Sequence, residues 1–319
     1  MKKKAIIISV VIVAVLAAIL IPLLCIPRPV TGKIVVIPLT GSITTDQSSL
    51  LSGPVITPDL VSHYLTRAEK DPAVKAVILR IESPGGEIAP CQEILWAIER
   101  FKETKSVPVV VSMGGTAASG GYYISTEADK IVALPTTMTG SIGVISAVIN
   151  IKELLDKLGI QIEMFKGGKY KDMYWGFREL TPEEQEIMQA LIDEYYEDFV
   201  AVVAEGRGLS KEEVRSLATG QIYTGTQAKE LGLVDELGDL DTATDLAMEL
   251  AGIETAMVEY YQPPRVTIWS LLGLADAIKV RLSGLSAQDI ILLEILSYSY
   301  RQPIFLYQSQ LHPLVVNCP

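Results

Sequence analysis

The sequence has only two histidines, His63 and His312, among its 319 residues. They are far apart in the chain, and neither stands beside another candidate catalytic group. A Ser-His-Asp triad or a multi-histidine metal site would have to use one or both of them. Cysteine is also scarce: Cys25, Cys91 and Cys318 are scattered without a CxxC pair. We therefore expect no zinc site and no disulfide framework, and the residues suggest no cofactor.

Basic residues are few as well. The sequence has 27 Lys and Arg against 38 Asp and Glu, a net charge of −11. Binding to nucleic acid needs clustered Lys and Arg, so the acidic balance argues against nucleic acid as a partner. Apolar residues make up 49% of the chain, which is enough for the core of one domain of about 200 to 250 residues with appendages.

The amino terminus carries a long uncharged run. Lys2, Lys3 and Lys4 precede residues 5–26, which contain no charged side chain. As a helix this run would be about 33 Å long, enough to cross the hydrocarbon core of a membrane. It is longer than the apolar region of most signal peptides, and no A-x-A cleavage site follows it. We expect an uncleaved anchor of the cell membrane, with the lysines in the cytoplasm and the rest of the chain outside.

Beyond the anchor, apolar strand patterns alternate with helical ones, which predicts an α/β fold with parallel pairing. The predicted strands are residues 32–40, 74–81, 107–112, 130–134, 142–149 and 161–165. Helices are predicted over residues 87–102, 152–158, 227–231 and 241–250. Three further helices are predicted to start at Pro58, Pro182 and Ser210. Thr57 is the expected cap of the first helix, and Thr181 with Glu184 forms a capping box before the longest one.

The sequence divides into three parts. Residues 1–27 form the cytoplasmic tip and anchor, residues 28–255 the main α/β domain, and residues 256–319 an apolar extension. Within the extension, residues 266–282 have the apolar spacing of an amphipathic helix, which suits a membrane surface or a partner subunit. Packing of this helix against its own subunit is an equally good interpretation.

Three glycine-rich turns follow predicted strands, at residues 83–86 (SPGG), 117–121 (AASGG) and 139–143 (TGSIG). The carboxyl ends of parallel strands share one edge of a sheet, where ligands bind. In the first turn, the backbone N–H of Gly86 can approach a substrate closely and serve as an oxyanion donor. An ordinary tight turn is the alternative.

The second and third turns each contain a serine. Ser119 precedes a predicted helix, which would expose its hydroxyl and place the Gly120 N–H beside the same oxyanion. The turn departs from the GxSxG pattern because Ala117 replaces the first glycine. Tight packing of small residues is the alternative. Ser141 is a second candidate nucleophile, or a hydroxyl that holds a base in place.

With histidine so scarce, the base must be another residue. Lys169 and Lys171 lie in the segment GKYKD, just after the predicted strand 161–165. A lysine can act as a base where burial lowers its pKa, and Ser-Lys pairs are a known variant of the serine triad. A solvated surface lysine is the alternative, and the residues alone do not choose between Lys169 and Lys171.

An ordered set of motifs resembles the signal peptide peptidase SppA family in its short, single-domain form. The motifs are SPGG at 83–86, AASGGYYI at 117–124, ADKIVA at 128–133, TGSIGVI at 139–145, GKYKD at 168–172 and TGQIYTGTQAKELGLVDELG at 219–238. The resemblance covers roughly residues 35–250. It implies a ClpP/crotonase-like fold, a spiral of parallel strands and helices.

The resemblance also implies residue roles. Ser119 would be the nucleophile, Lys171 the general base, and Ser141 the residue that orients the lysine amine. The N–H groups of Gly86 and Gly120 would form the oxyanion hole. In single-domain members the protomers form a ring, and the serine and lysine of one site come from neighbouring subunits.

The function expected from this resemblance is a membrane-anchored serine endopeptidase. It would hydrolyse residual signal peptides and other apolar peptides at the outer face of the membrane. The alternatives are a protease of the same clan that cleaves one membrane protein, as in the stomatin-operon group, an acyl-CoA enzyme of the crotonase fold, and a non-catalytic oligomeric scaffold. An external location argues against acyl-CoA, which is cytosolic.

Overall fold

A computed structural model describes residues 32–45, 54–262 and 304–305. Its main sheet has the strand order β10-β7-β6-β4-β1-β11, and each pairing along this path is parallel. These strands are β1 (Gly32–Thr40), β4 (Val74–Ser83), β6 (Val109–Ala118), β7 (Lys130–Ala133), β10 (Glu236–Leu237) and β11 (Ala256–Tyr260). Two further strands extend the sheet at the end of β6. β8 (Met138–Gly140) pairs parallel with β6, and β9 (Ile222–Thr224) pairs antiparallel with β8.

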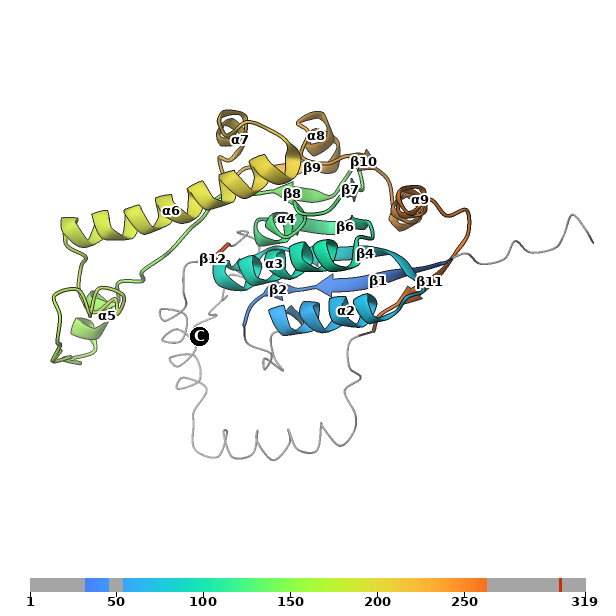
Figure 1. The fold of residues 1–319 in the computed structure, drawn as a ribbon. Helices are drawn as coiled ribbons and strands as arrows, with labels where there is room; N and C mark the ends of the chain where they lie inside the picture. Colours follow the sequence, from blue (N-terminus) through green and yellow to red (C-terminus); the bar gives the residue numbers. More distant parts are fainter. Residues whose placement is uncertain (1–31, 46–53, 263–303, 306–319) are drawn as a thin grey trace, which may run out of the picture.

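Helices cover both faces of this sheet (Figure 1). Val35 and Ile37 of β1 belong to the larger core cluster, with residues of α2 (Pro58–Lys70) and α3 (Ile88–Lys105). Ile34 and Val36 point to the opposite face, where Ala243 of α9 (Leu240–Ala251) packs. Because both faces are buried, β1 is a continuous apolar run, as expected of a parallel strand between helix layers. The arrangement is a mixed α/β fold that fits the ClpP-like class.

Three of the predicted helix starts are confirmed by the hydrogen bonds of their caps. The Thr57 hydroxyl accepts from the Leu60 N–H at 3.2 Å at the start of α2. Thr181 and Glu184 form the predicted capping box at the start of α6 (Pro182–Arg207), and α7 (Lys211–Leu217) has a second box. The other described helices are α4 (Gly120–Tyr123), α5 (Lys152–Lys157) and α8 (Gly225–Glu230).

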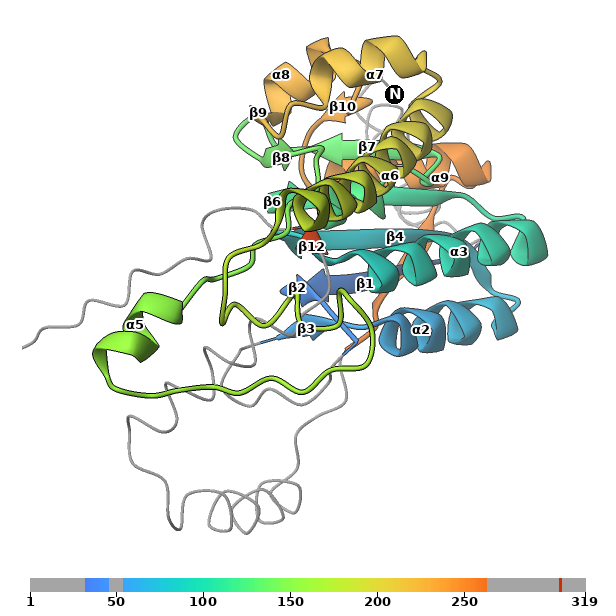
Figure 2. The ribbon, with the colours of Figure 1, turned by 90° about the vertical axis from the view of Figure 1, so that its left-hand side faces the viewer.

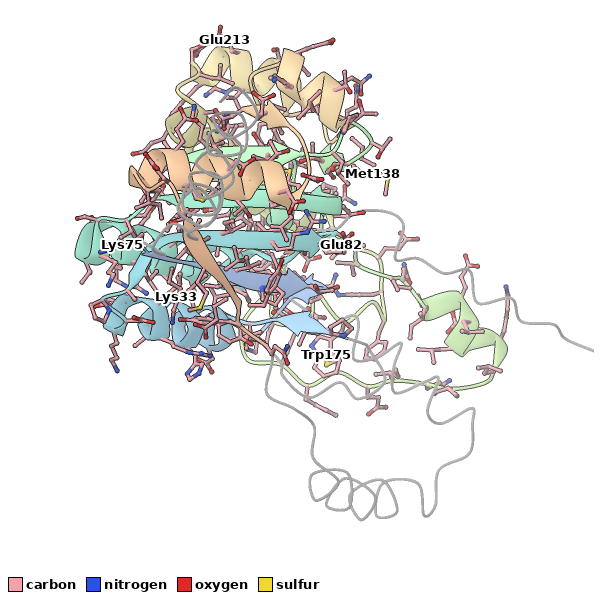
Figure 3. The ribbon with its side chains drawn as sticks, turned by 90° about the vertical axis from the view of Figure 1, so that its right-hand side faces the viewer. Lys33, Lys75, Glu82, Met138, Trp175 and Glu213 are labelled. Atoms are coloured by element: carbon pink, nitrogen blue, oxygen red, sulfur yellow. The ribbon has the colours of Figure 1, made fainter. Side chains whose placement is uncertain are left out.

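A smaller sheet follows the carboxyl ends of β1 and β4. Its order is β12-β5-β2-β3, with β2 (Ser42–Ile43), β3 (Val55–Ile56), β5 (Gly86–Glu87) and β12 (Ile304–Phe305). β12 pairs antiparallel with β5, which places Phe305 opposite Gly86. Figure 3 shows Lys33 and Lys75, near the amino ends of β1 and β4, toward the opposite end of the strands from Glu82 and Met138.

Residues 145–180, here termed the arm, depart from the prediction. The helix expected at 152–158 is confirmed as α5, but the strands expected at 142–149 and 161–165 are absent. Ile149, Ile162 and Phe165 are exposed instead. A strand needs a neighbour to satisfy its backbone groups; within these segments only Ile145 forms a β-bridge, and neither segment belongs to a described ladder. Figures 1 and 2 show α5 set apart from the sheet, beyond one end of α6.

Two predicted segments lie outside the described residues: the membrane anchor at 5–26 and the amphipathic helix at 266–282. Among the residues that are described, no helix combines the length and the apolar character needed to cross a bilayer. The anchor and the three-part division of the chain stay predictions.

Candidate active site

Ser119 occupies a strained turn between β6 and α4. Its φ of 52° and ψ of −120° are unusual for a residue with a side chain, and such strain persists only where the surroundings enforce it. Its N–H donates to the Gly140 carbonyl oxygen at 2.8 Å, which holds the turn against the end of β8. This is the strand-turn-helix placement of a nucleophile elbow, although Ala117 replaces the first glycine. The sequence pattern alone did not predict this strain.

The Ser119 hydroxyl is buried and unpaired. The residue is 1% exposed, so the exposed hydroxyl expected from the sequence is wrong, because the turn packs against the end of β8. The Ser119 Oγ has no hydrogen-bond partner within the described part of the chain. A buried polar group without a partner destabilises a fold by about 1–3 kcal/mol. A strained backbone and an unpaired buried hydroxyl at one residue are typical of a functional site.

Ser141 lies close to Ser119 in the fold. β6 and β8 pair with Ala118 opposite Gly140, so the two serines follow directly from paired residues. Ser141 also has a positive φ, 51°, and its N–H donates to the Gln221 carbonyl oxygen at 2.8 Å. The structure therefore brings the second and third glycine-rich turns together, as the sequence predicted.

Gly86 and Gly120 are in close contact. A Cβ built on Gly120 would lie 3.2 Å from the Gly86 nitrogen and 2.5 Å from the Cys91 Sγ. The turn before Gly86 depends on Gly85, whose φ is 106° and whose N–H donates to the Ser83 hydroxyl at 3.1 Å. Both predicted oxyanion donors thus lie together beside the Ser119 turn.

Cys91 is a residue that sequence reasoning missed as part of this site. It faces the core from α3, and burial raises the pKa of its thiol well above the usual value. The thiol is therefore neutral and serves to pack beneath Gly120. Helical apolar spacing was its only signal in the sequence, and that spacing places it in the core without indicating its neighbour.

Lys171 is not brought to the serines within one chain. It lies in the arm with an exposed side chain, and its backbone N–H donates to the Gly168 carbonyl oxygen. Lys169 is bound instead to the Glu183 carboxylate, whose hydrogen bond raises the pKa of the Lys169 amine. A raised pKa makes a lysine a weaker candidate for a base that must be neutral.

Helix α6 separates the arm from the Ser119 turn. Toward its carboxyl end, Asp198 accepts from the Tyr123 hydroxyl at 3.0 Å, and the Phe199 ring packs edge-on against the Tyr123 ring. At its amino end, Glu184 binds Arg178 of the arm. These two contact residues of α6, Asp198 and Glu184, are 14 residues apart, or about 21 Å along a helix. Figure 1 shows α6 running from above α4 to the arm.

Residues 101–254 match the family model described as peptidase family S49. A protein named as a protease in Synechocystis sp. is 40% identical over 236 residues, covering 73% of this chain and 84% of that relative. A protein named as signal peptide peptidase SppA in Enterococcus faecium is 39% identical over 230 residues, covering 72% and 67%. Protease 4 of Salmonella typhi is 40% identical over 204 residues, and the match spans 64% of this chain and 33% of that protein.

A solved structure of the 1510-N membrane-bound stomatin-specific protease, an S97A mutant, has a TM-score of 0.48 and 17% identity, covering 73% of this chain and 99% of that one. A likeness at that score supports no assignment. The assignment rests instead on the family match and on two relatives that are 39–40% identical over most of their length. This chain belongs to peptidase family S49, the family of the SppA serine peptidases.

Proposed function

We propose that the protein is a serine endopeptidase with a Ser-Lys dyad, in which Ser119 is the nucleophile and Lys171 the general base. One observation carries the proposal: a strained, buried and unpaired serine hydroxyl beside two closely placed glycine N–H groups. A hydrolytic site needs a nucleophile together with donors for the developing oxyanion, and this turn supplies both.

The proposed mechanism follows from these positions. The neutral Lys171 amine takes the proton of the Ser119 Oγ as that oxygen attacks a peptide carbonyl carbon. The N–H groups of Gly86 and Gly120 donate to the oxyanion, and losing one such donor lowers the rate by about 10²–10³. The protonated amine then gives its proton to the leaving nitrogen, and a water activated by the same amine releases the acyl group. Ser141 orients the lysine amine.

We further propose that one site combines two chains. Lys171 is tied to one end of α6, and the helix that follows Ser119 packs near the other end. A lysine side chain is about 6 Å long, much less than the helix length between Glu184 and Asp198 of α6. This separation supports a homo-oligomer, such as a ring, in which Lys171 of one copy serves Ser119 of the next.

The proposed substrate is an extended peptide that lies along β5. The pairing of β12 with β5 supports this, because it puts a strand of the chain antiparallel to the edge that carries Gly86. A peptide bound in this way would take the place of β12 beside β5, and its scissile carbonyl can then lie near the oxyanion donors. Residual signal peptides and other apolar peptides, met at the outer face of the membrane, are the proposed physiological class.

The dyad is tested by substitution and labelling. Ser119→Ala and Lys171→Ala should each abolish peptide hydrolysis, while Lys169→Ala, two residues away, should retain it. A fluorophosphonate probe should label the wild-type chain, and peptide mapping should find the label on Ser119. Turnover by either inactive variant would overturn the assignment, and a chain that takes no label would favour the scaffold alternative.

Sharing of the site is tested by mixing. Co-assembled Ser119→Ala and Lys171→Ala chains should recover part of the wild-type activity, since some sites then combine an intact serine with an intact lysine. Proven mixed oligomers without activity would rule out shared sites. A peptide library then addresses the substrate: broad cleavage of apolar peptides supports the signal peptide role, and cleavage of one sequence supports a single membrane protein as the target.

A further inference from the structure

Arg178, in the arm, uses all five N–H donors of its guanidinium. It binds the Asp172 carboxylate through Nε at 3.0 Å and Nη2 at 2.7 Å. It binds the Glu184 carboxylate through Nη1 at 2.8 Å and Nη2 at 2.6 Å. The remaining donor of Nη1 reaches the Glu179 carbonyl oxygen at 3.0 Å. Two bidentate pairs on one guanidinium fix both the distance and the orientation of the groups they join.

Both carboxylates are buried, Asp172 in the arm and Glu184 at the start of α6. Asp172 is 9% exposed and Glu184 is 2% exposed, whereas α5 of the same arm has no buried residue. Lys166 adds a second cation to Asp172 at 2.6 Å, and the Thr181 N–H donates to Glu184 at 2.9 Å. Because a buried charge is tolerated only with its partners in place, this cluster holds the arm in one position.

The cluster stands between Lys171 and the body of the protein. Asp172 is the residue after Lys171, and Glu184 lies in the first turn of α6. At its other end α6 is bound to Tyr123 of α4, the helix that begins directly after Ser119. A continuous set of contacts therefore connects the nucleophile turn of a chain to the lysine of the same chain, through a rigid helix.

On the other side of Lys171, Lys169 and Tyr170 bind the exposed Glu183 carboxylate in the first turn of α6. A Cβ built on Gly167 or on Gly168 would meet no atom within 4 Å, and the φ of Gly168 is 103°. Exposed ion pairs contribute little stability, so the firmer support for Lys171 is the buried Asp172, the neighbour that Arg178 holds.

We propose that Arg178 is a positioning residue for Lys171, holding it at the amino end of α6 where it can meet Ser119 of a neighbouring copy. This rests on the proposed dyad. Arg178 touches neither substrate nor reacting atoms in this proposal. It acts through Asp172 and Glu184, and its removal would leave Lys171 present but misplaced.

The first test compares three variants of the full-length protein in an assay of peptide hydrolysis. Arg178→Gln should lower kcat by about 10- to 100-fold, since a displacement of about 1 Å in a catalytic group has an effect of that size. KM should stay within about twofold, because the substrate strand is not touched. Arg178→Lys should recover part of the loss, since it keeps the charge but not the two bidentate pairs.

Arg215→Gln is the matched control. Arg215 of α7 also makes a bidentate pair with an α6 carboxylate, Glu197, at 3.0 and 2.7 Å, but toward the opposite end of the helix from Lys171. Its loss removes a bidentate ion pair of α6 with an exposed carboxylate, and kcat should stay at the wild-type value. Wild-type kcat in Arg178→Gln, or an equal loss in Arg215→Gln, would overturn the proposal.

The second test asks which chain needs Arg178. The change is placed either in the Ser119→Ala chain, which supplies Lys171, or in the Lys171→Ala chain, which supplies Ser119. Activity recovered by mixing should fall only in the first arrangement. An equal fall in both would show a general role in folding or assembly and would overturn the positioning role.

The two proposals fail in different ways. If the unmodified mixture recovers no activity, the shared site is wrong, and the kcat comparison still decides whether Arg178 positions Lys171.

Discussion

A methyl group added at Gly120 should lower stability through one contact and catalysis through another. In Gly120→Ala the new Cβ would lie 2.5 Å from the Cys91 Sγ and 3.2 Å from the Gly86 nitrogen. Cys91 is fully buried, so its sulfur cannot turn toward solvent. Overpacking of this kind destabilises a core by about 1–3 kcal/mol, and we expect a loss of unfolding free energy in that range.

A second substitution tests whether the sulfur is the cause. Cys91→Ala removes the Sγ and should by itself destabilise the fold by about 1–2 kcal/mol, through lost burial and the small cavity left. In the double variant the methyl group added by Gly120→Ala takes up part of that space. The double variant should therefore be less destabilised than the sum of the two single variants, by about 0.5–3 kcal/mol.

Catalysis should not recover with stability. The Gly86 nitrogen stays 3.2 Å from the new Cβ in both backgrounds, so the proposed oxyanion hole remains obstructed. Urea unfolding measures the first effect, and the rate of labelling by a serine-directed probe measures the second. Additive destabilisation would refute the Cys91 contact. Wild-type labelling in Gly120→Ala would refute the role of this contact in the oxyanion hole.

Three further predictions concern the same fold. Ser141→Ala should lower kcat without abolishing hydrolysis, and an unchanged kcat would remove its orienting role. Hydrogen bonds from Arg178 lower the pKa of Glu184 to about 2, so this carboxylate stabilises the fold above its usual pKa and the benefit is lost as the pH falls toward 2. The urea midpoint of Arg178→Gln should therefore lie below that of the wild type at pH 7, and the gap should narrow from about pH 4.5 downward; a constant gap would contradict this. Gly86→Ala would overlap the Ile43 carbonyl oxygen, so urea unfolding should show a loss of stability and a peptide assay a loss of activity, and a fully active variant would show that β5 can shift away from β2.

Local patterns were enough for much of the fold. β1 runs over Gly32–Thr40 as predicted, because an apolar run bounded by turn residues suits a strand buried on both faces. The starts of α2 and α6 follow from Thr57 and Thr181, whose hydroxyls cap backbone N–H groups three residues on. Such signals are local, so they do not depend on the rest of the chain.

The arm shows where local patterns fail. Residues 142–149 and 161–165 have the composition of strands, yet they form none, since a strand also needs a partner strand in the right place. The packing of Cys91 against Gly120 and the Arg178 cluster were missed for a related reason. Each joins residues whose neighbours in space are set by how separate elements pack.

The sequence by itself determined the α/β class, the glycine-rich turns at the sheet edge and, through its shortage of histidine, the need for a different base. Only the tertiary structure decided where these parts lie relative to one another. It placed Ser119 in a strained, buried turn beside Gly86 and Gly120, and it placed Lys171 at the far end of α6. The physical reason is that residue chemistry is a property of each position, whereas strain, burial and distance arise only when strands and helices distant in sequence pack together.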